Sequence, residues 1–583
     1  MYVCVCEITS RRGFDQGCPL AAAAFAVGQR EALEAFLLQL QTLDPDARLY
    51  SYLDDTYLVV DAQLAALALT GLSQALQPLG LNLNSSKTTA WSPAGRAAVA
   101  PDLANNWVGT LPVLGAFLKA QGDSDEAPHH LGQAGSGLPE ATRRLDKLWG
   151  NLKPLLAAGL RRQAAAALLR TYAGAASQHA LQLTHATQAE ADSYDATLKG
   201  AWEDLAGRKL DDQATLRLGL ATKLGGVGVQ WATARRHAAF WAGWTALAPD
   251  VRLDLGLDTL ADLLDKLPAT AAQLRDARDG LEQQGAPVSE GAALSDALGT
   301  HAKQRTYLNV VQKKQHAALL QQLSTDEGAW FQGCGGSGAG GFLQYPEDAN
   351  SSMEDELWST ALKLRLGLPR PELNQQQLQL GATSCNNKAP NNTACGAPLD
   401  NNGLHVLSCK TGGGVMRRHW HLAEASAGLL KRWTGEKPLR EQRVPTWDRQ
   451  RQNPEPGEDP LERAVLDIEY TEANERQWID VTARNPAAGD SADRRRAARK
   501  AGEAARRAER GKHERYPGEH LTALVVELPG RLGGEARQWL KQMVRSHLPQ
   551  DCWTHELTRA YKVLSCTVQS HLARQLRSAA GLR

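Results

Sequence analysis

The sequence is short of several residue types, and each shortage excludes a class of protein. Nine cysteines in 583 residues are too few for a disulfide scaffold. No apolar run approaches the ~18–20 residues that cross a bilayer, and the N-terminus lacks a signal-peptide pattern. There are only 7 Phe, yet 15 Trp and a hydrophobic content of 43% give a globular composition. We therefore expect a soluble, intracellular protein of several domains.

The chain as a whole has almost no net charge, because its 65 basic residues nearly cancel its 64 acidic ones. The two ends of the chain nevertheless differ. Residues 1–150 hold 10 basic and 15 acidic side chains, whereas residues 491–583 hold 19 basic and 9 acidic ones. The C-terminal end therefore has the charge of a region that binds polyanions.

The residue patterns predict a multidomain α+β protein. Short Val- and Tyr-rich runs predict strands at 2–8 and 57–60, with helical spacing between and after them at 19–41 and 62–78. The glycine run at 333–341 predicts a flexible break. The composition divides the chain into 1–120 (α/β), 121–140 (a Gly/Ser/Pro-rich linker), 141–380 (helical), 381–420 (rich in Asn, Gly and Cys) and 421–583 (α/β).

Tyr52-Leu53-Asp54-Asp55 places two adjacent carboxylates in a tight turn before a strand. Such a pair is costly unless a cation neutralises it, and Mg²⁺ prefers carboxylate oxygens. Two metals held in this way activate a hydroxyl and stabilise a leaving phosphate. Alone, the motif is better explained as an Asp-Asp turn on a solvated surface, because Asp pairs are common in turns.

Cys385, Cys395, His405 and Cys409 supply three thiolates and one imidazole within 25 residues. This donor set suits tetrahedral Zn²⁺, and the surrounding segment has little to bury, so that metal would supply its folding energy. The alternative is a loop with incidental cysteines. The run MRRHWH follows, in which Arg417, Arg418 and His419 are candidates for contacts with phosphate and bases; a solvated helix start is the alternative.

Asp467 and Asp480 lie 13 positions apart on two predicted strands, 464–470 and 477–483, and a basic helix is predicted at 491–515. The layout resembles PD-(D/E)xK nucleases, in which two such acids hold one or two metals that activate water against a phosphodiester. Thr482 stands where that family has Lys, and Leu466 where it usually has Pro. By this resemblance Lys512 replaces the missing Lys from the helix, with Lys500 as the competing candidate.

Three further blocks flank Asp54 and Asp55 in order: Gly13-x-x-Gln16-Gly17-x-Pro19-Leu20, then Leu81-x-Leu83-Asn84-x-x-Lys87-Thr88, then Leu114-Gly115. This order resembles the second half of a reverse transcriptase palm that continues into the thumb. The resemblance implies that Gln16 and Gly17 lie beneath the templating base and the incoming nucleotide. It also implies that Asp54 and Asp55 are magnesium ligands and that Lys87 lies on the triphosphate side.

A palm half, a Cys/His cluster and then two spaced acids resemble an N-terminally truncated non-LTR retrotransposon reverse transcriptase with a restriction-like endonuclease. The resemblance implies a partial palm (1–120), a helical thumb and connection region (141–380), a CCHC zinc knuckle (381–420) and a nuclease (421–583). Implied cofactors are Mg²⁺ and Zn²⁺. Implied partners are an RNA template and a DNA target, in the nucleus, with target-primed reverse transcription as the activity.

Two alternatives remain open: a catalytically dead remnant that binds nucleic acid, and a host-domesticated factor. A polymerase needs a further Asp on the strand before Gly13, and the only acid between Met1 and Gly13 is Glu7. We therefore expect this chain alone to lack processive polymerase activity.

Overall fold

The structure is a computed structural model, and it describes residues 21–52, 55–113, 116–119, 134–135, 137–288, 291–301, 303–374, 383–400, 403–451 and 459–582. The chain forms two compact units, an N-terminal unit (residues 1–136) and a C-terminal unit (residues 137–583), and each is described by itself. The expected nucleotide-site residues Gln16 and Gly17, and the expected metal ligand Asp54, lie outside the described residues.

The N-terminal unit combines helices with short antiparallel strands. Its core forms because α1 (Ala21–Gln41) carries Leu33, Phe36 and Leu40 at helical spacing, and this stripe packs against α2 (Ala65–Leu76). Strands β1 (Arg48–Tyr52) and β2 (Asp55–Val59) form an antiparallel hairpin. A second antiparallel sheet contains β3 (Thr110–Val113), β4 (Ala116–Lys119) and β5 (Ala134–Gly135).

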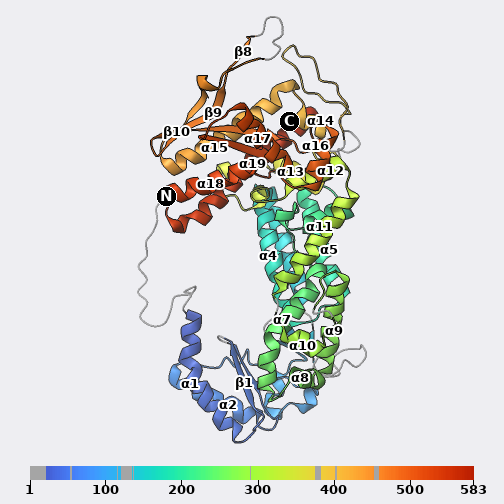
Figure 1. Ribbon diagram of the computed structural model, residues 1–583. Coiled ribbons are helices and arrows are strands. Elements are labelled where there is room, and N and C mark those ends of the chain that lie inside the picture. Colours follow the sequence, from blue (N-terminus) through green and yellow to red (C-terminus); the bar gives the residue numbers. More distant parts are fainter. Residues whose placement is uncertain are drawn as a thin grey trace. The chain divides into compact units, whose positions relative to one another are not determined.

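The first half of the C-terminal unit is helical, as the Ala/Leu-rich sequence predicts (Figure 1). Its main core is built around buried Trp202 and Trp358. Its α-helices are α3 (Leu138–Ala157), α4 (Arg162–Leu183), α5 (Gln188–Ala206), α6 (Asp212–Gly219), α7 (Ala232–Asp254), α8 (Leu260–Lys266), α9 (Pro268–Gln283), α10 (Leu294–Gly299), α11 (Gln304–Gln322), α12 (Thr325–Cys334) and α13 (Asp355–Leu366).

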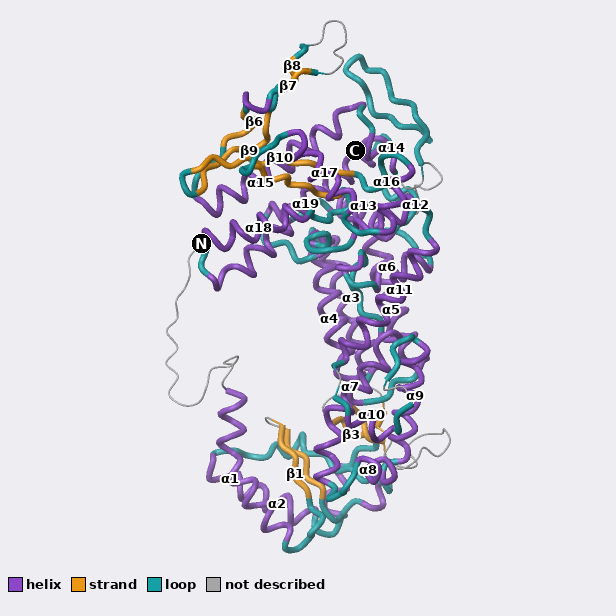
Figure 2. The backbone as a smooth tube through the Cα atoms, viewed as in Figure 1, coloured by secondary structure: helices purple, strands orange, loops and turns teal. Residues whose placement is uncertain are grey.

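The second half of the C-terminal unit contains a four-stranded sheet in the order β11-β10-β9-β6, and Figure 2 labels its strands β6, β9 and β10. Strand β10 pairs antiparallel with β9 and parallel with β11, and β6 pairs antiparallel with β9. The strands are β6 (Leu439–Arg443), β9 (Val465–Glu472), β10 (Glu475–Arg484) and β11 (Leu521–Glu527); β7 (Arg449–Gln450) and β8 (Leu461–Glu462) form a separate pair. The helices are α14 (Leu404–Ser408), α15 (Gly414–Thr434), α16 (Ser491–Arg499), α17 (Glu503–Arg515), α18 (Gly534–His547) and α19 (Trp553–Ala579).

Helices cover both faces of this sheet. Ala505 and Ala508 of α17 pack on Ala523 and Val525 of β11. Ile468, Ile479, Leu524 and Val526 join a core with residues of α15, α18 and α19. The parallel β10–β11 pair is crossed over by α16 and α17, as parallel pairing requires. The second half is thus an α/β layer structure.

The two halves of the C-terminal unit share one interior. Cys566 and Ala573 of α19 belong to the same core cluster as Trp202 and Trp358 of the helical half. Among the described residues, no helix combines the length and the apolar content that crossing a membrane requires.

The glycine-rich segment 333–341 is packed, which differs from the expected flexible break. A Cβ on Gly335 would lie 2.7 Å from the Lys223 carbonyl oxygen, and one on Gly341 would lie 2.6 Å from that of Tyr561. The glycines are therefore explained by close backbone contact with the neighbouring segments rather than by freedom of movement.

Candidate functional site

The β9–β10 hairpin brings Asp467 and Asp480 together. Its two-residue turn, Ala473-Asn474, has positive φ at both positions, as a type I′ turn requires. In the antiparallel register that follows, Glu472 pairs with Glu475 and the ladder continues to Ile468 and Ile479. Asp467 and Asp480 are the next residues on the two strands, so the 13-residue spacing is the consequence of a symmetric hairpin.

The pairing of β9 with β10 ends at this point, because the Val481 N–H bonds to a side chain and not to a main-chain carbonyl of β9. Oδ2 of Asp467 accepts a hydrogen bond of 2.7 Å from the Val481 N–H. Its other oxygen, Oδ1, lies 2.9 Å from Nε2 of His419 on α15. Burial alone would raise the pKa of Asp467, but the His419 contact and the Val481 N–H hold this pKa below its usual value.

Asp480 is the more deeply buried acid, at 5% exposed. Burial raises the pKa of its carboxyl to about 6, the facing Asp467 acts in the same direction, and Lys512 acts against both. The acids thus have different environments, one held ionised and one close to protonation. A divalent cation between them would remove their repulsion, because carboxylate oxygens are ligands of hard cations.

Lys512 of α17 completes the group. Its Nζ lies 2.7 Å from Oδ2 of Asp480, and its side chain is 24% exposed. Lys500, the competing candidate, is 70% exposed and its nearest acid is Glu503, at 4.0 Å. The two lysines separate because the expected helix 491–515 is broken between α16 and α17, where Gly502 has φ +77°. The structure therefore brings Lys512, and not Lys500, to the two aspartates.

The three candidates for nucleic-acid contact on α15 have different surroundings. Arg417 is exposed and donates to the Gly412 carbonyl, and His419 contacts Asp467 as described above. Arg418 corrects the expectation, because it is 3% exposed and bonds to Gln575 and to the Leu407 carbonyl. Its guanidinium holds α15 against α19 and does not reach a ligand at the surface.

Cys385, Cys395, His405 and Cys409 converge on one point. Their ligand atoms all lie within 4.8 Å of one another, and Sγ of Cys395 is 3.5 Å from Nε2 of His405. Backbone bonds from Cys395 N–H to the Asn387 carbonyl and from Gly396 N–H to the Cys385 carbonyl fold the first two ligands into a turn. The short α14 carries His405, and Cys409 follows its end.

This Cys3His group could hold a metal such as zinc. Burial raises the pKa of Cys385 to about 11, with the neighbouring thiols acting in the same direction. A bound cation would reverse that effect by stabilising thiolates, which is how zinc couples to the folding of small Cys/His segments. The donor set and its convergence therefore fit the predicted zinc site.

Of the expected polymerase residues, Asp55 and Lys87 are described. Asp55 begins β2 and pairs with Tyr52 across the hairpin, with its side chain exposed. Lys87 lies in an exposed turn whose backbone bonds to the Asn84 carbonyl. Among the described residues of this unit no ion pair joins the two side chains. Their polymerase roles remain expectations from the sequence.

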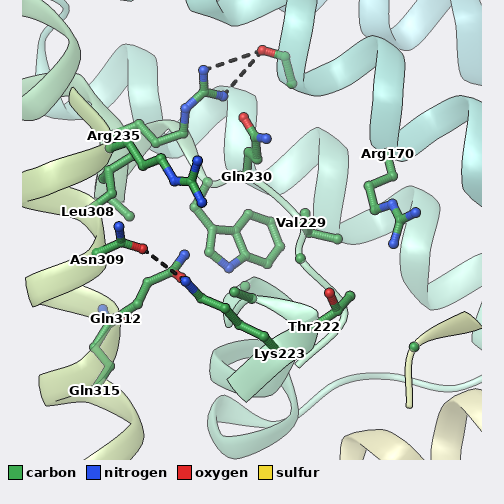
Figure 3. Close-up of a pocket in the computed structure, with 18 of the residues that line it drawn as sticks. Arg170, Thr222, Lys223, Val229, Gln230, Arg235, Leu308, Asn309, Gln312 and Gln315 are labelled. Atoms are coloured by element: carbon green, nitrogen blue, oxygen red, sulfur yellow. Dashed lines mark hydrogen bonds between the residues drawn. The ribbon is translucent and has the colours of Figure 1, made fainter. Parts of the chain in front are cut away.

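The C-terminal unit also contains a cavity of 1190 Å³, which the sequence did not predict. It is lined by α4, α7 and α11, by the loop 221–231 and by the glycine-rich segment, and Figure 3 shows Arg170, Lys223 and Arg235 around it. Together with Arg305 they make four basic residues in the lining, against the single acid Asp212. The four cations are spread between residues 170 and 305, so no single local motif contains them all.

Arg235 is buried and Arg170 is half-buried, and neither forms an ion pair with a carboxylate among the described residues. Arg235 donates to the Gly174 carbonyl and to Gln178, and burial lowers its pKa to about 10. Arg170 donates to the Val227 carbonyl. Trp231 and several amide side chains also line the cavity. Cations beside an aromatic ring and amide side chains can contact phosphate groups and stack on bases.

No family model matches this sequence, and no curated protein matches it either.

Proposed function

We propose that the C-terminal unit is a metal-dependent endonuclease that nicks DNA at Asp467, Asp480 and Lys512. The observation that carries this proposal is the convergence of these three side chains at the point where β9 and β10 separate. A pair of acids beside a lysine is the minimal set for hydrolysing a phosphodiester with a divalent cation.

Each residue has a role that follows from its surroundings. Asp467 and Asp480 would hold Mg²⁺, which supplies Lewis acidity and lowers the pKa of a bound water. Lys512 would stabilise the negative charge that develops on the phosphate. In the hydrolysis the water oxygen bonds to phosphorus and the P–O3′ bond breaks, which leaves a 3′-hydroxyl. That end is the one a polymerase extends.

We further propose that the nick primes reverse transcription, with an RNA template, in a nuclear retroelement protein. Support comes from the ordered palm motifs of the sequence and from the β1–β2 hairpin that carries Asp55. The Cys3His group, with zinc, would contribute to binding of the target.

The test is nicking of a supercoiled plasmid by the purified full chain with Mg²⁺. We expect Asp480→Asn and Lys512→Ala each to lower the rate by ~10²-fold or more. DNA binding should stay nearly unchanged, because it rests on the basic surface. Lys500→Ala is the matched control, since it removes a lysine of the same basic segment that does not reach the acids, and it should nick at the normal rate. Loss of nicking in Lys500→Ala but not in Lys512→Ala would refute the assignment.

The second candidate function is nucleic-acid binding without catalysis, which the basic cavity favours. If the intact chain binds single-stranded nucleic acid but never nicks DNA in Mg²⁺ or Mn²⁺, this function replaces the first. Arg170→Gln and Lys223→Gln should then weaken binding and reduce its salt dependence.

A further inference from the structure

A second group of potential metal ligands lies in the helical half of the C-terminal unit, far in sequence from the cysteines. His185 is in the turn between α4 and α5, His237 is on α7 and Asp276 is on α9. Their ligand atoms all lie within 4.8 Å of one another. Nε2 of His185 is 2.8 Å and Nδ1 of His237 is 3.9 Å from the same oxygen, Oδ2 of Asp276.

An ordinary His–Asp ion pair does not account for all three residues. His237 is 6% exposed, and neither its Nδ1 nor Nε2 of His185 has a hydrogen-bond partner of good geometry among the described residues. These two nitrogens are the ones that approach the same Asp276 oxygen.

The surrounding residues hold the two rings in place. Phe240 packs edge-on against His185, with ring centroids 5.3 Å apart. Gly280 of α9 lies so close to the His237 ring that an added Cβ would overlap with it. Packing thus fixes the orientations of the His185 and His237 rings, as a preorganised metal site requires. Asp276 is 58% exposed at its side chain and faces solvent.

The charge around the group is mixed. His237 is buried, and the Arg236 side chain lies near the group. The Arg236 guanidinium itself donates to the Ala186 carbonyl at 2.8 Å and opposes a nearby cation. The carboxylates of Asp276, Asp192 and Glu190 supply negative charge near the group, which offsets the positive charge of Arg236.

We propose that His185, His237 and Asp276 form a second transition-metal site, which binds Zn²⁺ through Nε2, Nδ1 and a carboxylate oxygen. With Zn–N and Zn–O bonds of about 2.0–2.2 Å, tetrahedral ligands lie roughly 3.3–3.5 Å apart. The observed 2.8 and 3.9 Å lie on either side of this separation, so a small movement of the exposed Asp276 suffices. A water would take the fourth position on the solvent side. The metal would tie α4, α7 and α9 together, and the site is independent of the proposed nuclease.

The test is the zinc content of the purified full chain and of variants, after dialysis against zinc-free buffer. We expect two zinc ions per chain in the unaltered protein and one in Asp276→Ala. Asp276 is chosen because it is exposed and its loss should not unfold the chain. Asp279→Ala is the matched control, since Asp279 is on the same helix, equally exposed and outside the group, and it should retain two.

Two further measurements, one on the variant Cys395→Ser and one with Co²⁺, distinguish metal bound at the new site from metal bound by the Cys3His group. We expect Cys395→Ser to keep one metal, which Asp276→Ala then removes. Co²⁺ bound at the new site should lack the thiolate charge-transfer absorption that the cysteines produce. One zinc per chain in the unaltered protein, with no change in Asp276→Ala, would overturn the proposal, as would equal losses in Asp276→Ala and Asp279→Ala.

Discussion

Two aspartates at the open end of a hairpin repel each other unless a proton or a cation lies between them. Here Asp480 has its pKa raised to about 6 and Lys512 contacts it, so the fold partly compensates for the repulsion. The proximity of the two acids could be predicted from their 13-residue spacing, because a hairpin with a two-residue turn places residues at that spacing opposite each other. The contact of Asp467 with His419 could not be predicted, because it depends on how α15 packs against the sheet.

Packing around Gly226 leaves no room for a side chain at this position. A Cβ on Gly226 would overlap with the carbonyl oxygen of Leu220, and the Gly226 carbonyl accepts a 2.9 Å hydrogen bond from buried Arg365. Arg365 bonds to the Thr222 and Ala339 carbonyls as well, so it joins the loop 221–231 to the glycine-rich segment.

We therefore predict that Gly226→Ala lowers the free energy of unfolding by about 2–3 kcal/mol, the cost of an added methyl in a packed interior. Gly200→Ala is the control, because Gly200 is inside α5 with nothing within 4 Å of an added Cβ. It should be neutral or stabilise by up to ~1 kcal/mol. Chemical denaturation of the two variants measures the difference, and equal stabilities would contradict the packing of this loop.

At the scale of elements, the sequence predicted two neighbouring strands of the sheet in the second half of the C-terminal unit. The runs 464–470 and 477–483 correspond to β9 and β10, because alternating and β-branched residues determine strands locally. The helix predicted at 491–515 is two helices, α16 and α17. The break at Gly502 could not be predicted, because the pattern of charged residues continues through it. Sequence alone therefore left Lys500 and Lys512 as alternatives, and the choice between them depends on tertiary packing.

Helices α15 and α19 are joined by one buried acid. Glu556, 6% exposed, accepts hydrogen bonds from Arg432 at 3.0 and 2.8 Å and from the Trp433 indole at 3.2 Å. The Arg432 contact is the largest influence that lowers the Glu556 pKa to about 2. A carboxyl whose pKa is depressed in the folded state stabilises the fold above its unfolded pKa, and this stabilisation is lost as pH falls through the folded value.

We predict that Glu556→Gln lowers the free energy of unfolding at pH 7 by about 1–2 kcal/mol, after allowance for the solvent exposure of Arg432. The deficit should shrink as pH falls from about 4.5 towards 2, because the unaltered carboxyl then becomes protonated as well. Denaturant unfolding at pH 7 and at successively lower pH tests this. A deficit that stays constant over this range would show that lost packing, rather than lost charge, is the cause.

At the scale of the whole molecule, the sequence suggested a nuclease domain beginning at residue 421, yet the packing crosses that boundary. Helix α15 begins at Gly414. At the other end of the chain, the Cys566 thiol donates to the Ser351 carbonyl, and the Ser565 hydroxyl accepts from the Phe342 N–H. Composition could not reveal this, because α19 contributes to the core of the helical half through residues that any amphipathic helix contains.

The last prediction concerns which fragment folds. Residues 137–583 contain the three largest core clusters in full, so we expect this fragment to unfold cooperatively and to retain the nicking rate of the full chain. Residues 421–583 alone would expose the face of α19 that packs on α13 and on residues 341–343, and would lose the first part of α15. Such an apolar face without its partner favours aggregation. Calorimetry and nicking assays on both fragments measure this, and a stable, active fragment 421–583 would show that the helical half is dispensable for the fold of the nuclease.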